Sequence, residues 1–287
     1  MIFSKKNFVD SSFYLNERFA SINSFGCGKI GNCELMCIYN YFVHIHQNVP
    51  IQWPSTVIEE IYNNAGVFPK TEQARIEFIE ELQECLKNID SLASWSTFNP
   101  DFETRFIKKN SFNCELIDLQ SIEPFYSGSP WTEHLEGKNV LVISPFTDTI
   151  CKQYKKRHLI WEDQRVLPTF KELLTLKHPH SPGIDIPSKY NSWLDMVRHF
   201  KSVIDTIDYD VLLVGAGASS LPLVAHAKKN GKKAIHLGGP LQLLFGIKGG
   251  RWDTGPIGKH FYNEHWVKPI NDETPKNHLT IENGCYW

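Results

Sequence analysis

The chain has 287 residues, of which 41% are hydrophobic and 22% charged, and its formal net charge is −2. These values are typical of a globular protein and exclude the overall basic field that recruits nucleic acid. No run of about 18 apolar residues could form a transmembrane helix, and residues 1–10 lack the apolar core of a signal peptide. Seven cysteines without a C-x-x-C pair indicate reduced thiols. We therefore expect a cytoplasmic protein.

The first 114 residues are predicted to be mainly helical. Residues 32–46 and 71–89 carry apolar side chains at the spacing of helices that bury one face. The glycine-rich stretch 25–34 (FGCGKIGNCE) precedes the first of these helices, and its backbone can approach a ligand closely. Its polar side chains either contact that ligand or cap the helix. The candidate ligand contacts are Gly28, Lys29, Gly31, Asn32 and Glu34.

Short apolar runs alternate with helical patterns between residues 115 and 253. The predicted strands cover 115–119, 139–143 (NVLVI), 211–214 (VLLV) and 234–237, and the predicted helices cover 149–157, 192–207 and the segment after Gly215-Ala216-Gly217. Residues 166–176 (VLPTFKELLTL) are ambiguous, because a strand could begin before Pro168. The alternation predicts an α/β fold, a doubly wound, mainly parallel Rossmann-like sheet with the helical N-terminal region packed on it.

The C-terminal residues 254–287 show no clear period and are expected to wrap across the sheet. We therefore predict a single α/β domain over 1–287, with a mainly helical part at 1–114 and a Rossmann-like core at 115–253. One unit is favoured because the glycines at 26–31 can serve a ligand only if they pack against the later sheet edge.

Ligand-binding loops are expected where the predicted strands end. After the strand at 211–214, a glycine turn leads into a helix whose N-terminal amides could bind phosphate. The loop 144–148 (SPFTD) offers Ser144 to phosphate or ribose, and Asp148 as a base or a helix cap. The loop 238–253 (GGPLQLLFGIKGGRWD) carries cations that could balance a leaving diphosphate. The candidates in the turn are Gly215, Gly217, Ser219 and Ser220, and those in the last loop are Gly238, Gly239, Gln242, Lys248, Arg251 and Asp253.

The turn at 215–220 lacks part of the fingerprint that dinucleotide-binding proteins share. Counting from Gly215, the third position of the G-x-G-x-x-G pattern is Ser220, where Gly or Ala is required. The next predicted strand ends in Gly238-Gly239, where an enzyme that binds NAD has an acid for the ribose hydroxyls. The pattern therefore favours a phosphate site without the NAD acid, and a purely structural turn stays open as an alternative.

Residues 138–252 resemble uncharacterised bacterial and viral proteins allied to the GT-D-fold glycosyltransferases. The matching stretches are KNVLVISPF (138–146), DVLLVGAGASSLPLVAHAKKNGKKAIHLGG (210–239), LQLLFGIKGGRWD (241–253) and ENGCYW (282–287). The resemblance implies transfer of a sugar from a nucleotide-diphosphate donor to a glycan or lipid-linked acceptor in polysaccharide or glycoprotein glycan synthesis. It also implies the cytoplasm, that of the host if the chain is viral.

The GT-D family has an Arg-x-Gly-Asp-x-Glu element near its N-terminus, whose acids are associated with a metal and the nucleotide sugar. This chain has Lys29-Ile30-Gly31-Asn32-Cys33-Glu34 there. Glu34 matches and Lys29 keeps the charge, but Asn32 replaces the Asp. Because Mg²⁺ and Mn²⁺ favour charged oxygen ligands, the loss of one carboxylate weakens the implied metal site, with Glu34 as its remaining acid.

The sequence leaves two alternatives to glycosyl transfer. The first is an NAD(P)-dependent or nucleotide-sugar-modifying enzyme on the same scaffold. The second is a non-catalytic protein that binds a nucleotide sugar, which the replacement of the second acid by Asn32 favours. In the transferase interpretation, the catalytic candidates are Glu34, Asp148 and Asp253.

Overall fold

The computed structural model describes residues 11–21, 23–94, 98–111, 113–181, 183 and 188–287. Seven strands form one sheet in the order β3-β2-β1-β7-β6-β4-β5, and every neighbouring pair is parallel. The strands are β1 Phe25–Gly28, β2 Ser91–Ser94, β3 Glu115–Asp118, β4 Asn139–Ser144, β5 Glu172–Lys177, β6 Val211–Val214 and β7 Lys233–His236. The predicted α/β, Rossmann-like class is therefore confirmed.

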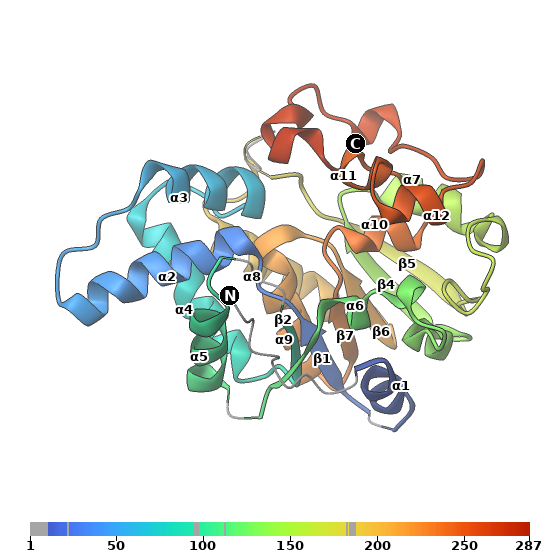
Figure 1. Ribbon diagram of the computed structural model, residues 1–287, viewed down its shortest axis with the longest axis horizontal. Coiled ribbons are helices and arrows are strands. Elements are labelled where there is room, and N and C mark those ends of the chain that lie inside the picture. The colour runs from blue at the N-terminus through green and yellow to red at the C-terminus, as the bar shows by residue number, and fades with distance from the viewer. Residues whose placement is uncertain (1–10, 22, 95–97, 112, 182, 184–187) are drawn as a thin grey trace.

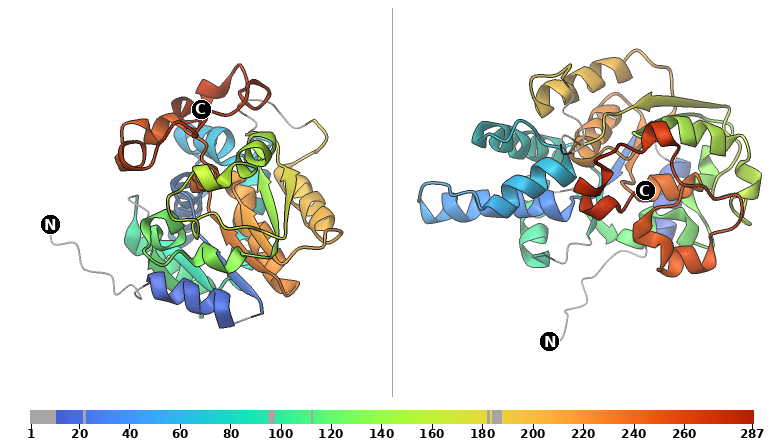
Figure 2. Two further views of the ribbon diagram at one scale, coloured as in Figure 1. Left: turned by 90° about the vertical axis from the view of Figure 1, so that its right-hand side faces the viewer. Right: turned by 90° about the horizontal axis from the view of Figure 1, so that it is seen from above.

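Helices cover both faces of the sheet (Figures 1 and 2). The α-helices are α1 Ser11–Ser21, α2 Asn32–Gln47, α3 Ser55–Glu60, α4 Glu72–Leu86, α5 Pro100–Asn110, α6 Leu119–Ile122, α7 Thr147–Tyr154, α8 Trp193–Ile204, α9 Ser220–Lys229, α10 Pro240–Leu244, α11 Gly250–Asp253 and α12 Pro256–His260. A π-helix, η1 Ile61–Ala65, continues α3. The 3-10 turns are η2 Pro124–Tyr126, η3 Trp131–Leu135, η4 Arg157–Leu159, η5 Gly217–Ser219, η6 Asn271–Glu273, η7 His278–Thr280 and η8 Glu282–Gly284.

The pleat of the central strands divides the core into two layers. In β4, Leu141 and Ile143 join the cluster formed with α4, α8 and α9, whereas Val140 and Val142 face the cluster formed with α1, α7 and α10. All four side chains are fully buried. A strand buried on both faces reads as a continuous apolar run, which is why NVLVI was recognisable in the sequence.

Two strands lie in the part of the chain that was predicted to be mainly helical. β1 (FGCG) is central in the sheet, between β2 and β7, and β2 has the sequence SLAS. These two strands were not predicted individually, because short strands of small residues carry no hydrophobic run. The small residues have a packing reason: a Cβ at Gly28 would lie 2.6 Å from Leu221 of α9.

The other predicted elements agree closely with the structure. Thr71 caps α4, accepting a hydrogen bond from the Ala74 amide (3.2 Å), and Ser192 caps α8 in the same way. The ambiguous segment 166–176 becomes strand only from Glu172, so that Pro168 lies before β5. β5 is an edge strand whose side chains are only partly buried, which explains its weak signal.

The sheet has a topological switch point between β4 and β6. β4 continues through α7 to β5 on one face, and β6 continues through α9 to β7 on the other face, so the two connections leave in opposite directions. Such a point opens a crevice at the carboxyl ends of the strands, where doubly wound proteins bind ligands. The C-terminal segment (red in Figure 1) lies across this end of the sheet. Within the described residues, no helix has the length and apolar character needed to cross a bilayer.

Candidate functional site

A cavity of about 560 Å³ opens at the carboxyl edge of the sheet. Its floor is made by the residues that follow β1, β4, β6 and β7, which are neighbours or near neighbours in the sheet. The end of η1 and the segment 281–287 complete its wall. The cavity therefore collects residues from both ends of the chain at the switch point.

Lys29 and Glu34 bring opposite charges to the cavity from the loop after β1 and the first turn of α2. Burial raises the pKa of the Glu34 carboxyl above its ordinary value, although Lys29 opposes this. Burial also lowers the pKa of Lys29 to about 8, against the opposing charges of Glu123 and Glu34. The pKa values of both groups are thus shifted toward neutral pH by burial, and such shifts are common at functional sites.

The glycines after β6 and β7 allow segments of backbone to meet at the cavity floor. Gly238 has φ +65°, and a Cβ there would lie 3.4 Å from Lys29 Nζ. Gly217 has φ +53°, and a Cβ there would lie 2.6 Å from the Ala65 carbonyl oxygen. A Cβ at Gly215 would lie 2.8 Å from the Gly238 carbonyl oxygen. These glycines thus bring β6, β7, η1 and Lys29 together.

The hydroxyls of the two serines in the turn after β6 both accept hydrogen bonds from other groups of the protein. Ser219 lines the cavity, and its hydroxyl accepts a hydrogen bond from Trp193 Nε1 (3.1 Å). Ser220 lies outside the cavity lining, and its hydroxyl accepts a hydrogen bond from the Ala216 amide (2.9 Å). Ser220 therefore closes the turn itself, at the position where the dinucleotide fingerprint has Gly or Ala.

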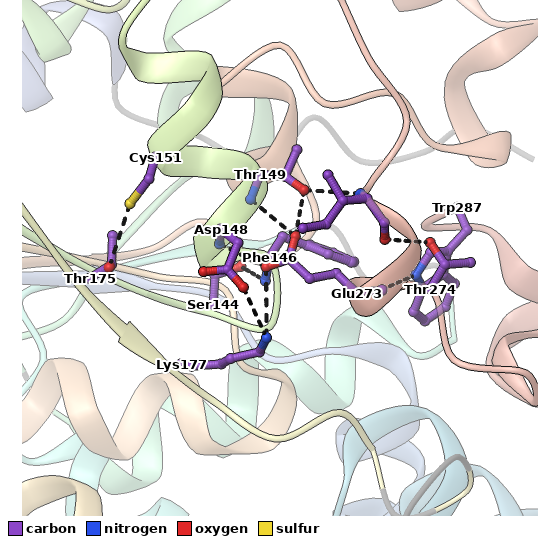
Figure 3. Close-up of polar contacts among 11 residues, drawn as sticks. Ser144, Phe146, Asp148, Thr149, Cys151, Thr175, Lys177, Glu273, Thr274 and Trp287 are labelled. Carbon is purple, nitrogen blue, oxygen red and sulfur yellow. Dashed lines mark hydrogen bonds and ion pairs between the residues drawn. The ribbon is translucent and has the colours of Figure 1, made fainter.

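The start of α7 is occupied by a carboxylate of the chain itself (Figure 3). Glu273, which is fully buried, accepts hydrogen bonds from the amides of Asp148 (2.8 Å) and Thr149 (3.1 Å). Ser144 lines the cavity, but its hydroxyl accepts from the Phe146 amide (3.1 Å). The side chain of Asp148 is 58% exposed and lies 3.4 Å from Lys177 Nζ, outside the cavity lining. The helix N-terminus after β4 is thus filled by Glu273.

Only part of the loop 238–253 faces the cavity. Gln242 lines it and donates hydrogen bonds to the carbonyl oxygens of Lys248 (3.1 Å) and Tyr286 (3.0 Å), which ties the C-terminal segment to the loop. Arg251 also lines it, is paired with Glu282, and lies 4.9 Å from the centre of the Tyr286 ring.

The remaining candidates of this loop lie elsewhere. Lys248 Nζ is 5.3 Å from the centre of the Tyr262 ring, and Asp253 pairs with Lys268 at 3.0 Å. The candidates that line the cavity are Lys29, Gly31, Asn32, Glu34, Ser144, Gly215, Gly217, Ser219, Gly238, Gly239, Gln242 and Arg251. Those that do not are Gly28, Asp148, Ser220, Lys248 and Asp253.

Several cavity residues were not singled out from the sequence. His178, directly after β5, donates from Nδ1 to the Pro179 carbonyl oxygen (2.8 Å), and burial lowers its pKa to about 4. The ring is therefore neutral near pH 7, and its buried Nε2, an acceptor, has no hydrogen-bond partner. The signal that could have located His178 is its place at a strand end. Phe146, His180 and Trp287 form an aromatic wall with ring centres 5.7–5.9 Å apart.

The residues that could hold a metal ion are Asn32 and Glu34, whose oxygen atoms belong to the same turn at the cavity. Across the described ranges, no three His, Cys, Asp or Glu side chains are grouped as metal ligands. A bound Mg²⁺ or Mn²⁺ would need further oxygens from phosphate, as is usual for Mg²⁺.

No family model matches the chain, and a search of curated proteins likewise finds no match. Among solved structures, one described as "Selenomethionine substituted structure of domain of unknown function 1792 (DUF1792)" is similar. The identity is 14%, the match covers 80% of this chain and 83% of that chain, and the TM-score is 0.38. A similarity of this size carries no argument about activity.

Proposed function

We propose that the protein is a glycosyltransferase that moves a sugar from a nucleotide-diphosphate donor to a glycan or lipid-linked acceptor. The observation that carries this proposal is the meeting of Lys29, Glu34 and Arg251 in one cavity of about 560 Å³ at the switch point of a parallel sheet. Nucleotides bind at such switch points in doubly wound folds, and the volume is in the range of small-molecule and cofactor sites.

In this proposal the two cations act on the leaving group. Lys29 and Arg251 balance the charge that develops on the diphosphate as its bond to the anomeric carbon breaks. The acceptor hydroxyl oxygen forms the new bond to that carbon, and its proton passes to the carboxylate of Glu34. A carboxyl whose pKa is raised by burial is a better proton acceptor than an ordinary one. Asp148 and Asp253 have no part in this step, because neither lines the cavity.

A metal ion would assist this chemistry by neutralising the diphosphate. Asn32 and Glu34 are the side chains that would hold it, donor phosphates would supply further ligands, and Glu34 would then act as a metal ligand instead of as the base. Metal dependence is therefore tested together with the donor. We expect melting temperatures to rise with one nucleotide sugar, since a ligand at about a hundred times its Kd adds about 2.7 kcal/mol to the free energy of unfolding. Repeating the screen with Mn²⁺ and with chelator separates a metal-dependent site from one that uses Lys29 and Arg251 alone.

Four substitutions test the assignment of residues. Glu34→Gln and Arg251→Ala change side chains that line the cavity, whereas Asp253→Asn and Lys248→Ala change the same kinds of charge outside it. The proposal requires the first pair to reduce sugar transfer by at least about tenfold, the size of a lost charge-assisted hydrogen bond, and the second pair to leave it nearly unchanged. Full transfer by both cavity variants would show that the cavity is not the site of reaction.

The second candidate is a protein that binds a nucleotide sugar without transferring it. Asn32, at the position of the family's Asp, favours this candidate because an amide is a weaker ligand for a hard cation. A donor that raises the melting temperature but is neither hydrolysed nor transferred, across a panel of acceptors, would support it. Stabilisation by NAD(P) alone would support instead a nicotinamide-dependent enzyme.

A further inference from the structure

The second half of α2, the connection that follows it and the start of α3 form a projecting arm, residues 39–56. In Figure 1, α2 runs from the centre of the molecule to its left edge and α3 returns above it, and the right view of Figure 2 shows the same projection. The three buried residues of α2 are Leu35, Cys37 and Ile38, all in its first two turns. None of the residues 39–56 is buried.

The arm has no Asp, Glu, Lys or Arg, which is unusual for an exposed segment, and its basic side chains are those of His44 and His46. No Asp, Glu, Lys or Arg occurs anywhere in 35–58, although 22% of the whole chain is charged. At its tip Ile45 and Val49 are 49% and 45% exposed. Tyr41 and Trp53, further back, are partly buried and pack against the core, and Arg75 lies 4.6 Å from the centre of the Trp53 ring. The tip of the arm therefore exposes two aliphatic side chains with no Asp, Glu, Lys or Arg around them.

A basic helix face lies directly beside the arm. α5 packs against α2 through Phe106, whose ring centre is 5.7 Å from that of Phe42. Arg105, Lys108 and Lys109 are exposed on α5 at positions i, i+3 and i+4, so they share one face. Lys109 Nζ lies 5.8 Å from the centre of the Phe42 ring, which places this charge next to the aromatic side of the arm.

We propose that the arm and the basic face of α5 dock together on an anionic lipid surface. Ile45 and Val49 at the tip can enter the headgroup region without the desolvation of an Asp, Glu, Lys or Arg side chain. The three cations of α5 complement anionic headgroups. Neither the apolar tip nor the three cations of α5 would bind a membrane strongly alone. Together they favour an anionic membrane, because the burial of apolar area and the electrostatic attraction add.

The arm also connects the lipid surface to the cavity. α2 begins at the cavity with Asn32 and Glu34, and its exposed Ile45 lies eleven residues further along the helix. At a rise of 1.5 Å per residue this is about 16 Å. A bilayer at the tip would thus hold the cavity near its surface, where a lipid-linked acceptor is found. The docking does not depend on the proposed function, because it is measured without any sugar donor.

Co-sedimentation of the full chain with vesicles tests the proposal. We expect binding to phosphatidylcholine vesicles that contain about one-third phosphatidylglycerol, and clearly weaker binding to pure phosphatidylcholine. Ile45→Asp with Val49→Asp should reduce binding more than about tenfold, because two charges would have to enter the interface. Lys108→Glu with Lys109→Glu should reduce binding to the anionic vesicles by about fivefold or more for each lysine.

Matched controls alter similar residues away from the arm. Phe13→Asp replaces an apolar side chain that is 73% exposed on α1, and Lys152→Glu with Lys155→Glu reverses two exposed charges around the end of α7. Both should bind like the unaltered chain. The proposal is overturned if the unaltered chain does not bind anionic vesicles, or if the arm variants bind as well as it does. A dimer that the Ile45→Asp, Val49→Asp variant dissociates, without vesicle binding, would show that the arm contacts a second copy instead.

Discussion

The carboxylate of Glu34 folds back against Gly31, the residue that caps the helix on which Glu34 lies. A Cβ at position 31 would collide with Glu34 Oε2. The glycine therefore holds open the space in which the carboxylate sits at the cavity wall. This relationship gives the sequence Gly31-Asn32-Cys33-Glu34 a steric meaning that is independent of any metal.

Substitution of Gly31 should disable the site without unfolding the protein. In Gly31→Ala the added methyl group displaces the Glu34 carboxylate, and a shift of about 1 Å in a reacting group can cost about a hundredfold in rate. We expect kcat/KM for sugar transfer to fall by this order while the melting temperature changes little. Gly128→Ala is the control, because a Cβ at Gly128 meets nothing within 4 Å. Undiminished transfer by Gly31→Ala would remove Glu34 from the mechanism.

Protonation of Lys29 should make donor binding dependent on pH. Burial lowers the pKa of Lys29 to about 8. Because a diphosphate binds the ammonium form, donor affinity should fall about tenfold from pH 7 to pH 9. Calorimetry at the two pH values measures this, and Lys29→Met should bind weakly at both. A donor affinity that is equally high at pH 7 and pH 9 in the unaltered chain would contradict the role of Lys29.

The same pKa predicts the direction of a stability change. Lys29 loses its proton near pH 8 in the folded chain and near its ordinary value of 10.5 in the unfolded chain. Between these values the unfolded state binds more protons, so the contribution of Lys29 to the free energy of unfolding rises with pH. Relative to Lys29→Met, the unaltered chain should therefore gain stability from pH 8 to pH 10 in urea titrations. A relative loss over this range would show that the ammonium form is the one stabilised by folding.

The sequence alone predicted the strands whose residues form a continuous apolar run. NVLVI and VLLV are apolar runs buried on both faces, and they predicted β4 and β6 within one residue. β1 was not predicted as a strand, because FGCG has three small residues, yet it lies at the centre of the sheet. Its strand character comes from pairing with β2 and β7, whose paired residues are 64 and 208 positions away and leave no trace in the local pattern.

The candidate site, like the fold, could be predicted from the sequence only in part. Glycines and charged residues at strand ends were sufficient to select Lys29, Glu34 and Arg251, all of which line the cavity. Asp148 was selected by the same rule, but its amide is capped by Glu273, 125 residues later. Which carboxylate fills the helix N-terminus depends on how the C-terminal segment folds across the sheet. No spacing in the sequence specifies that contact.

Loss of the Glu273 carboxylate should destabilise the protein and loosen the cavity wall. Glu273→Gln leaves one acceptor oxygen where two main-chain amides and the Thr149 hydroxyl now donate, which should cost about 1–3 kcal/mol. Trp287 Nε1 donates to the main-chain oxygen of Glu273 (2.7 Å), so the wall at Trp287 should become more mobile. Urea unfolding measures the first effect, and hydrogen exchange of the Trp287 indole N–H, followed by NMR, measures the second. Asp272→Asn, at an exposed neighbour, should have neither, and equal stability of both variants would contradict the capping role.

Two glycines with similar backbone angles should respond differently to alanine. Gly217 and Gly231 have φ +53° and +79°, so Gly→Ala at either should cost about 1–2 kcal/mol through the left-handed conformation. At Gly231 a Cβ meets nothing within 4 Å, whereas at Gly217 it would lie 2.6 Å from the Ala65 carbonyl oxygen. A backbone carbonyl cannot rotate away as a side chain could. Gly217→Ala should therefore lower the free energy of unfolding by about 1–3 kcal/mol more than Gly231→Ala does.

The Gly217→Ala and Gly231→Ala variants also test the contact between η1 and the edge of the sheet. Gly217 and Ala65 both line the cavity, so Gly217→Ala should weaken donor binding as it forces η1 away from the turn after β6. Gly231, at the end of α9, lies outside the lining, and Gly231→Ala should bind the donor normally despite its lower stability. Equal free energies of unfolding for the two variants in urea would show that η1 does not press on Gly217. Equal donor affinities would show that the contact between η1 and the turn does not shape the site.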